Sequence, residues 1–330
     1  MQAWINQVWY GKSLWRWILM PLSWLYAIIT AIRRCLYHFG FKEKIILPVP
    51  VIIVGNITVG GSGKTPTVIF LIELLRRHGY KPGVISRGYG VDIDGVKSVH
   101  VGAKASEVGD EPAMIVARTH VPMVVGPKRI QAAKQLLADF EVDIIISDDG
   151  LQHYTMARNI EIVVVDGNRR LGNGMLLPAG PLREGAWRLK QADFIIVNGG
   201  EAKQGEYSMH LQPKPITPLL TDSTFTFHLD EPIVAMAGIG DPQRFFNSLQ
   251  LLGYQVHQTH GFNDHQAYHL SELMKVADGY PLVMTEKDAI KCVDFAKENW
   301  GYLAVDASIA SGFEQDLLVK MGHEVQATKS

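Results

Sequence analysis

The chain has 330 residues, of which 47% are hydrophobic and 20% are charged, and its formal net charge is −1. This composition is typical of a globular protein with about two domains, and the near-neutral charge gives no sign of a nucleic-acid partner. Cys35 and Cys292 are the only cysteines, too few for a disulfide framework or a cysteine-built metal site.

The first 44 residues differ from the rest of the chain. They hold six basic residues against one acidic residue, a balance of +5, so the remainder carries −6. The sixteen residues from Trp17 to Ile32 carry no charge, and five of the seven tryptophans lie in this segment. These tryptophans are Trp4, Trp9, Trp15, Trp17 and Trp24. Tryptophans, an apolar run and flanking Lys or Arg are typical of a segment that lies at a membrane interface.

Other interpretations of this segment remain open. A secretory signal peptide would end in small residues at a cleavage site, but two arginines follow the apolar run. A membrane-spanning helix needs about 20 apolar residues, and this run is shorter and is interrupted by Pro21 and Ser23. A helical arm packed on its own domain is a further alternative. We favour attachment to the membrane surface, with residues 1–44 as a membrane-associating arm.

From residue 49 onward, apolar strands alternate with helical segments. Residues 51–54 form a short β-branched run, which predicts a buried strand. Apolar residues three or four apart after Pro66 predict a helix that ends near Gly79. Further strands are predicted over 83–86, 121–125, 142–147, 161–166 and 194–198, and a helix over 128–140. This order predicts an α/β fold, a parallel sheet covered by helices on both faces.

Glycines and prolines interrupt this rhythm between residues 200 and 232, which predicts a linker with a short extended segment over 224–229. A second α/β unit follows. Its predicted strands are 233–237, 254–257, 282–284 and 302–305, and its predicted helices are 242–252, 270–277, 287–299 and 313–321. The predicted domains are therefore 45–212 and 233–330, with residues 213–232 as the linker between them.

A glycine-rich loop lies between the 51–54 strand and the Pro66 helix. Its residues are Thr58, Val59, Gly60, Gly61, Ser62, Gly63, Lys64 and Thr65. The P-loop pattern is G-x-x-x-x-G-K-[ST], and Thr58 stands where its first glycine belongs. Glycines allow backbone N–H groups to surround phosphate oxygens, Lys64 can reach the β- and γ-phosphates, and Thr65 can ligate Mg²⁺. The loop predicts a nucleotide site.

Acidic and basic residues follow several of the predicted strands. Asp148 and Asp149 end the apolar 142–147 strand, where a carboxylate for Mg²⁺ belongs, because nucleotides bind at the carboxyl ends of parallel strands. Adjacent residues of a strand point to opposite sides, so we expect the two aspartates to have different tasks. Further candidates follow other strands or begin helices: Arg87, Tyr89, Asp110, Glu111 and Arg129. Arg87 and Arg129 would place two basic sites at the same edge of the sheet, which points to an anionic substrate.

These motifs resemble the tetraacyldisaccharide 4′-kinase family, the lipid A 4′-kinases. Seven segments carry the resemblance, in the family's order: 55–66, 86–90, 109–112, 147–153, 178–184, 262–265 and 285–288. The resemblance implies two Rossmann-like, P-loop NTPase-type α/β domains joined by a linker, with the site between them. It also implies a kinase that moves the ATP γ-phosphoryl group to the 4′-hydroxyl of a lipid A disaccharide precursor. The family also lacks the first P-loop glycine, so Thr58 fits it.

The resemblance also implies roles for single residues. Asp110 matches the family's proposed general base and His265 matches its partner from the other domain, while Lys64 matches the phosphate contact. Thr65, Asp148 and Asp149 match the metal site, to which we add Glu111. Polar positions of less defined role are expected to contact the substrate: Arg87, Tyr89, Arg129, His153 and Arg183.

The implied cofactors are ATP and Mg²⁺, and the implied partners are the lipid precursor and an anionic membrane surface. No nucleic acid and no obligate protein partner are expected. The expected location is the cytoplasmic face of the bacterial inner membrane, in a peripheral or monotopic arrangement, because ATP is scarce outside the cytoplasm.

The main alternative is a membrane-recruited ATPase switch of the deviant-Walker type. Such proteins carry a signature lysine at the position that Val59 holds here, which argues against this class. A GTPase is disfavoured because the lysine of Thr285-Glu286-Lys287-Asp288 stands one place too late for guanine recognition. A non-enzymatic lipid-binding adaptor is a further alternative, but such a protein would not need a nucleotide-binding P-loop.

Overall fold

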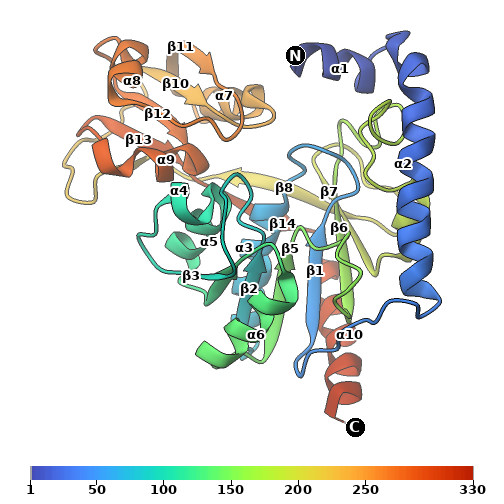
Figure 1. The fold of residues 1–330 in the computed structure, drawn as a ribbon. Coiled ribbons are helices and arrows are strands. Elements are labelled where there is room, and N and C mark those ends of the chain that lie inside the picture. The colour runs from blue at the N-terminus through green and yellow to red at the C-terminus, as the bar shows by residue number, and fades with distance from the viewer. Residues whose placement is uncertain (1, 330) are drawn as a thin grey trace.

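The computed structural model describes the backbone of residues 2–329 and the side chains of residues 4–322. It has two sheets and a long N-terminal helix that stands beside the larger sheet (Figure 1). The smaller sheet lies above the carboxyl ends of the central strands of the larger one (Figure 1). The α/β class and the parallel sheets therefore agree with the prediction.

The larger sheet has the strand order β14-β8-β7-β6-β1-β5-β2-β4-β3. The strands from β8 to β4 run parallel, and β14 and β3 pair antiparallel at the two edges. Their bounds are β1 Val51–Gly55, β2 Pro82–Ser86, β3 Lys97–Val99, β4 Met123–Val125, β5 Ile144–Asp148, β6 Ile160–Asp166, β7 Phe194–Asn198, β8 Tyr207–Pro213 and β14 Val305–Ile309.

Alternate residues of the central strands pack on opposite faces of this sheet. Ile52 and Val54 of β1 belong to the core that α3 (Lys64–Arg77), α5 (Asp110–Thr119) and α10 (Ser311–Lys329) cover. Val51 and Ile53 belong to the core on the other face, which α6 (Arg129–Asp139) covers. The residues on both faces of these central strands are buried, which explains why the strand sequences are continuous apolar runs. The remaining short helices of this unit are α4 (Ala105–Val108) and the 3₁₀ helix η1 (Ala186–Gln191).

The smaller sheet has the order β11-β10-β12-β13-β9, parallel except for β9. Its strands are β9 Thr217–Pro218, β10 Pro232–Ala237, β11 Gln255–Gly261, β12 Leu282–Thr285 and β13 Trp300–Leu303. Its helices are α7 Pro242–Leu251, α8 Leu270–Ala277, α9 Glu286–Cys292 and the 3₁₀ helix η2 Val293–Phe295. Two local predictions were wrong, because residues 224–229 form no strand and the helix predicted over 287–299 ends at Cys292.

The second domain also ends earlier than predicted. The strand expected over 302–305 is split between two sheets, because β13 ends at Leu303 in the smaller sheet and β14 begins at Val305 in the larger one. Helix α10 follows β14 back to the first core, where the ring of Phe313 lies 5.4 Å from the rings of both Phe194 and Tyr207. Residues 305–322 therefore pack with the first domain, since they cover the β8 edge and one face of its sheet.

The N-terminal arm consists of α1 (Gln2–Tyr10) and α2 (Trp15–His38). Helix α2 continues through Pro21 and is 24 residues long, more than the uncharged run alone. By length and composition it qualifies as a membrane span, and no other helix in the described part of the chain does. The helix is thus long enough to cross a membrane, although the uncharged run within it is still the sixteen residues from Trp17 to Ile32.

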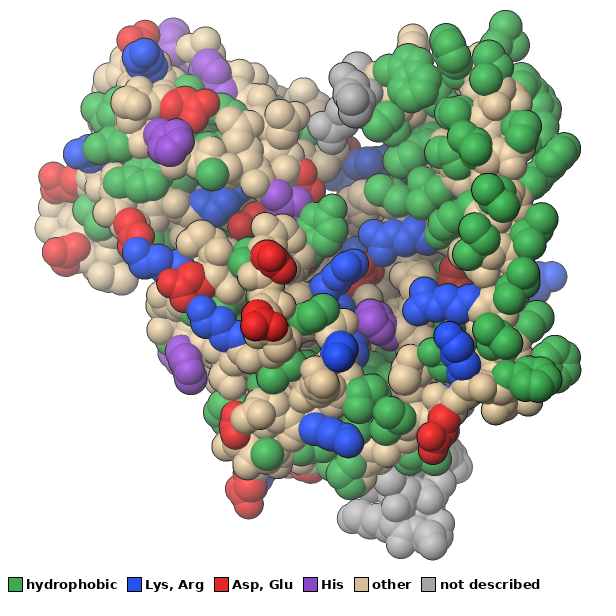
Figure 2. All heavy atoms as spheres, in the orientation of Figure 1, with side chains coloured by type: hydrophobic (Ala, Val, Ile, Leu, Met, Phe, Trp, Pro, Cys, Tyr) green, Lys and Arg blue, Asp and Glu red, His purple; other side chains and the backbone are tan. Residues whose placement is uncertain are grey.

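One face of α2 is anchored to the body of the protein. The Ser23 hydroxyl donates to the Leu176 carbonyl at 2.8 Å and accepts from the Ala179 N–H at 3.0 Å. The Tyr26 hydroxyl donates to the Arg183 carbonyl at 3.0 Å. The other face presents large apolar side chains that are each more than half exposed: Trp15, Trp17, Ile18, Leu22, Trp24, Leu25, Ile28, Ile29 and Ile32. Figure 2 shows this apolar surface along the whole helix.

Candidate active site

The glycine-rich loop joins β1 to α3 at the carboxyl edge of the larger sheet. Gly60 and Gly63 have φ values of 106° and 97°, which side chains with a Cβ rarely adopt. A Cβ on Gly63 would lie 2.5 Å from Asn198 Nδ2, so the packing also requires glycine there. Helix α3 begins at Lys64, and its free N–H groups together with the loop amides provide an anion site.

Lys64 points towards the acidic end of β5. Its Nζ lies 3.6 Å from Asp149 Oδ1, and the Arg183 Nη1 lies 3.0 Å from Asp149 Oδ2. Burial alone would raise the pKa of Asp149, but Lys64 and Arg183 outweigh it and lower that pKa. Asp149 therefore stays ionised and pairs with two cations, one of which is the P-loop lysine.

Asp148 is buried beside it, with 1% of its surface exposed. Its Oδ2 accepts from the Ser86 hydroxyl at 3.3 Å, and its Oδ1 has no hydrogen-bond partner. Burial raises the pKa of Asp148 to about 7, Glu111 adds to this shift, and Lys64 opposes it. An ionisable oxygen that is buried without a partner fits a missing cation, and carboxylate oxygen is the ligand type that Mg²⁺ prefers.

No group of three or more His, Cys, Asp or Glu side chains within the described residues is arranged to hold a metal ion. Mg²⁺ in phosphate-transfer sites is held by one or two carboxylates, phosphate oxygens and waters rather than by a cage of side chains. Asp148 and the Thr65 hydroxyl next to the P-loop suit that kind of site. Asp149, which was also predicted at the metal, lies just outside β5 with a φ of 50° and pairs with Lys64 and Arg183, so we keep only Asp148 of this pair as a candidate metal ligand.

Asp110 and His265 meet across the two domains, although 155 positions separate them. Asp110 is the first residue of α5, and His265 follows β11 in the second domain with a φ of 62°. His265 Nδ1 lies 3.1 Å from Asp110 Oδ2. Burial works to raise the pKa of Asp110, but the hydrogen bond from His265 and the charges of Lys291 and Lys287 together lower it. Asp110 is therefore an ionised carboxylate, the form that can accept a proton.

Glu111 is the second residue of α5 and faces the second domain. Its Oε1 lies 3.4 Å from Lys287 Nζ, and its side chain is 30% exposed. Its charge raises the pKa of Asp148, so the two carboxylates are close enough to interact. Binding of a cation between them would relieve that repulsion, which is consistent with the predicted place of Glu111 near the metal.

Two of the predicted substrate-binding residues lie near α2, because the Tyr26 hydroxyl donates to the Arg183 carbonyl and the charge of Arg33 acts on His153. Arg129 is buried, and its guanidinium donates to the carbonyls of Gly126 and Asp148. Burial and the charges of Arg129, Arg33 and Arg87 lower the pKa of His153 to about 4, so this imidazole is neutral. Figure 2 shows Lys and Arg side chains gathered in the hollow between the apolar helix and the rest of the molecule.

Tyr89 is exposed and lies beside His265 of the second domain. Its ring lies 5.0 Å from the ring of His265, and 63% of its surface is accessible. Arg183, through Asp149, connects the basic hollow with Lys64 of the P-loop. The structure thus brings the predicted catalytic, phosphate-binding and substrate-binding residues to one edge of the larger sheet.

A cavity of about 490 Å³ lies between the P-loop and the second domain. Residues of both domains line it, among them Gly61, Lys64, Glu111, Asp241, Phe245 and Lys287. Its apolar walls next to the P-loop suit the base and sugar of a nucleotide, whose phosphates would then lie at the loop. Both domains therefore form this cavity.

Three cations of the site were missed at the level of sequence. Lys287 and Lys291 lie one turn apart on α9 and face Asp110 and its neighbours. Arg118 of α5 donates to Glu286 at 3.0 Å and to the Val305 carbonyl at 2.8 Å, and it also pairs with Asp306. The Thr285-Glu286-Lys287-Asp288 motif was a signal for Lys287, but its distance along the chain from Glu111 hid the contact between them.

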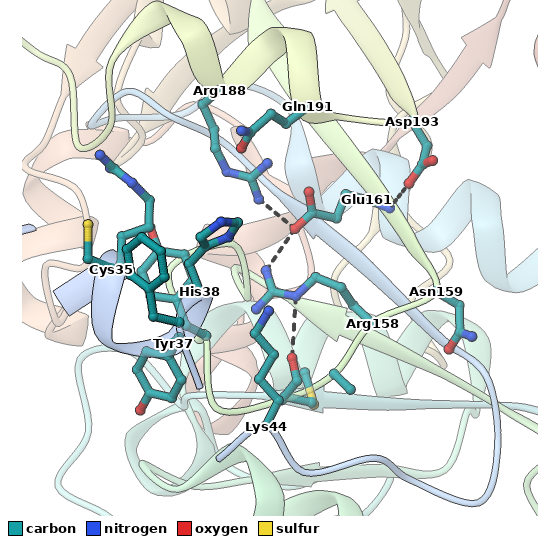
Figure 3. Close-up of a pocket in the computed structure, with 15 residues that line it drawn as sticks. Cys35, Tyr37, His38, Lys44, Arg158, Asn159, Glu161, Arg188, Gln191 and Asp193 are labelled. Carbon is teal, nitrogen blue, oxygen red and sulfur yellow. Dashed lines mark hydrogen bonds and ion pairs between the residues drawn. The ribbon is translucent and has the colours of Figure 1, made fainter. Parts of the chain in front are cut away.

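A second cavity of about 650 Å³ lies under the C-terminal end of α2 (Figure 3). On its floor, Glu161 Oε1 accepts from Arg158 at 2.8 Å and from Arg188 at 2.5 Å. The Glu161 carboxylate and the guanidinium groups of Arg158 and Arg188, which line this cavity, are thus paired with one another. It contains none of the residues predicted for the active site, and we assign it no part in the reaction.

A phosphate loop, a buried carboxylate and a cross-domain Asp–His pair at one sheet edge place the chain among the P-loop nucleotide-dependent phosphotransferases. Residues 15–322 match the family model described as LpxK, tetraacyldisaccharide-1-P 4′-kinase. The chain belongs to this family.

Relatives of the chain carry the same name. The tetraacyldisaccharide 4′-kinase of Shewanella baltica strain OS185 is 60% identical over 100% of this chain and 98% of its own length. That of Shewanella halifaxensis is 63% identical over 97% of this chain and 98% of its own length. The crystal structure of an "apo" form of LpxK from Aquifex aeolicus in complex with ATP covers 93% of this chain and 98% of its own, with a TM-score of 0.78 and 28% identity.

Proposed function

We propose that this protein transfers the γ-phosphoryl group of ATP to the 4′-hydroxyl of a tetraacyldisaccharide 1-phosphate, a step of lipid A biosynthesis. The observation that carries the proposal is the Asp110–His265 contact of 3.1 Å next to the P-loop cavity. A sugar hydroxyl is a poor nucleophile at neutral pH, and an ionised carboxylate held near the phosphate loop supplies the base that it needs.

In the proposed reaction, the hydroxyl oxygen attacks the γ-phosphorus while the bond to the bridging oxygen of ADP breaks. Asp110 accepts the hydroxyl proton, and His265 orients the carboxylate. The P-loop amides and Lys64 bind the phosphates and stabilise the charge that develops on the transferred group. Mg²⁺, held by Thr65, Asp148 and Glu111, would neutralise phosphate charge.

The substrate is proposed to enter from the hollow beside α2. Its 1-phosphate is an anion, and three cations of this region would attract it: Arg87 and Arg129, whose charges act on His153, and Arg183, which pairs with Asp149. The exposed apolar face of α2 supports attachment to the cytoplasmic face of the bacterial inner membrane, where acyl chains of the substrate are anchored. The neutral form of His153 suits a hydrogen bond to a sugar hydroxyl rather than a salt bridge.

The test is incubation of the purified protein with ATP, Mg²⁺ and the disaccharide precursor, followed by mass analysis of the lipid. The expected product is heavier by one phosphoryl group, and removal of Mg²⁺ with a chelator should abolish its formation. Lipid-stimulated ATP hydrolysis without a phosphorylated lipid would instead favour the deviant-Walker type of ATPase.

A further inference from the structure

Lys287 occupies an unusual place for a lysine. Helix α9 begins directly after β12, where the Thr285 hydroxyl accepts from the Asp288 N–H and caps the helix. Lys287 therefore lies in the first helical turn, where the helix dipole disfavours a cation. Its side chain is only 13% exposed, so the ammonium group needs negative partners close by.

Those partners come from both domains. Lys287 Nζ donates to Asp264 Oδ1 at 2.9 Å within the second domain and lies 3.4 Å from Glu111 Oε1 of the first. With a carboxylate from each domain as its partner, the side chain is an ammonium group with three donors and no acceptor.

The third contact of Lys287 determines where His265 carries its proton. Lys287 Nζ lies 3.4 Å from His265 Nε2. Because the ammonium can only donate, Nε2 must be the bare nitrogen that accepts, and the ring proton must lie on Nδ1. Nδ1 is the nitrogen that faces Asp110 Oδ2, so the proton lies where it can be donated to the proposed base.

A competing acceptor makes this arrangement depend on Lys287. Asp264 Oδ1 lies 3.7 Å from His265 Nε2, beyond hydrogen-bond distance, and is bonded to Lys287 instead. Without the ammonium, Asp264 would be the nearest acceptor and would favour a proton on Nε2. In the neutral ring, Nδ1 would then carry a lone pair instead of a proton. This lone pair would repel those of Asp110 Oδ2, and the hydrogen bond between the two side chains would be lost.

We propose that Lys287 is a positioning residue that keeps His265 in the Nδ1–H form and thereby holds Asp110 in place for the reaction. This inference rests on the proposed function for its effect on catalysis, but its effect on the imidazole does not. Lys287 acts through His265, so its loss should affect the chemical step more than nucleotide binding, although its side chain also lines the cavity next to the P-loop.

The first experiment compares two methionine variants. Lys287→Met removes the ammonium, and Lys104→Met is the matched control, because Lys104 also forms an ion pair between the domains, with Asp294 at 2.8 Å. Lys287→Met should lower kcat by about tenfold to a hundredfold, the range typical for outer partners of site residues, with a smaller relative change in KM for ATP. Lys104→Met should keep the parent kcat. Equal kcat in both variants would overturn the proposal.

The second experiment observes the imidazole directly. In ¹⁵N spectra of histidine rings, assigned with His265→Gln, the parent should show His265 with a bare Nε2 and a protonated Nδ1. Lys287→Met should show protonation at Nε2. Lys287→Arg also has only donors to offer, so it should keep the parent spectrum and more of the kcat, and it serves if the methionine variant fails to fold. A bare Nε2 in Lys287→Met would overturn the proposal.

A double variant tests the competition with Asp264. In Lys287→Met/Asp264→Asn no carboxylate faces Nε2, and the new amide can donate to it. The Nδ1–H form should return and kcat should rise several-fold above that of Lys287→Met, whereas a persistently protonated Nε2 would contradict the mechanism. A parent protein that forms no phosphorylated lipid would instead refute the proposed function, while the ring spectra would still decide the role of Lys287.

Discussion

At the scale of single residues, Asp148 is a group of the site whose charged form is disfavoured by burial. Its raised pKa, about 7 against an ordinary 3.8, means that the folded state binds a proton more tightly than the unfolded chain. The cost of keeping this carboxylate charged therefore grows as the pH rises from about 4 to about 7. A carboxylate that destabilises its own fold is expected where function requires it.

Asp148→Asn should raise the free energy of unfolding of the nucleotide-free protein at pH 8, by ~1–2 kcal/mol. The gain should be much smaller near pH 4, where the folded state holds the proton and the unfolded chain is already partly protonated. The same change should lower kcat strongly if Asp148 ligates Mg²⁺. The measurement is chemical denaturation at both pH values, with the exposed Asp222→Asn as control. Equal gains at pH 4 and pH 8 would show that the stabilisation does not come from ionisation.

At the scale of elements, α10 is the piece that the sequence pattern assigned to the wrong domain. Phe313→Ala removes a fully buried ring that packs on Phe194 and Tyr207, so it should cost about 3–5 kcal/mol of stability. Val319→Ala on the exposed side of the same helix should cost less than about 0.5 kcal/mol. Urea unfolding followed by circular dichroism measures both values. A small effect of Phe313→Ala would mean that α10 is not part of the first core.

Local patterns predicted most elements but not their partners. The β-branched run of β1 and the glycines before Lys64 indicate a strand, a phosphate loop and a helix without any tertiary information. Strand β14 is half-exposed and five residues long, and nothing in it indicates which sheet it joins. The contact between Asp110 and His265 came from the family resemblance, and the contact of Lys287 with both domains had no local signal.

The arm can be tested as one element. If α2 attaches to the bilayer through its exposed apolar face, deletion of residues 1–34 should release the protein into the soluble fraction. High salt should release the full-length protein only in part, because burial of apolar side chains is not screened. Sedimentation with membranes at low and high salt measures this. Complete release by salt alone would indicate purely electrostatic attachment, and resistance to carbonate would indicate a true span.

At the scale of the whole molecule, the site exists only when the two domains meet. Asp110 and Glu111 come from the first domain, while His265 and Lys287 come from the second, and Arg118 connects α5 with α9 and β14. Separation of the domains would leave Asp110 without its partner and the nucleotide cavity open to water. Assembly of the base by domain contact would limit wasteful hydrolysis of ATP.

This arrangement predicts that the losses of Asp110 and His265 are not additive. Asp110→Ala should lower kcat by about 10²–10⁴-fold, the range of general-base catalysis, and His265→Ala somewhat less. Once the base is gone its orienting partner has little left to do, so the double variant should lie close to Asp110→Ala alone. Nucleotide affinity should change little in all three variants, because the P-loop supplies it.

The measurement is kcat for the two single variants and the double variant, with ATP binding determined separately by titration calorimetry. Multiplicative losses would show that the two residues act independently, in spite of the 3.1 Å contact between them. A collapse of ATP binding in Asp110→Ala would move this carboxylate from the role of base to that of a nucleotide or metal ligand. Loss of kcat with retained ATP binding and no further loss in the double variant is the outcome expected of one acid–base unit shared by two domains.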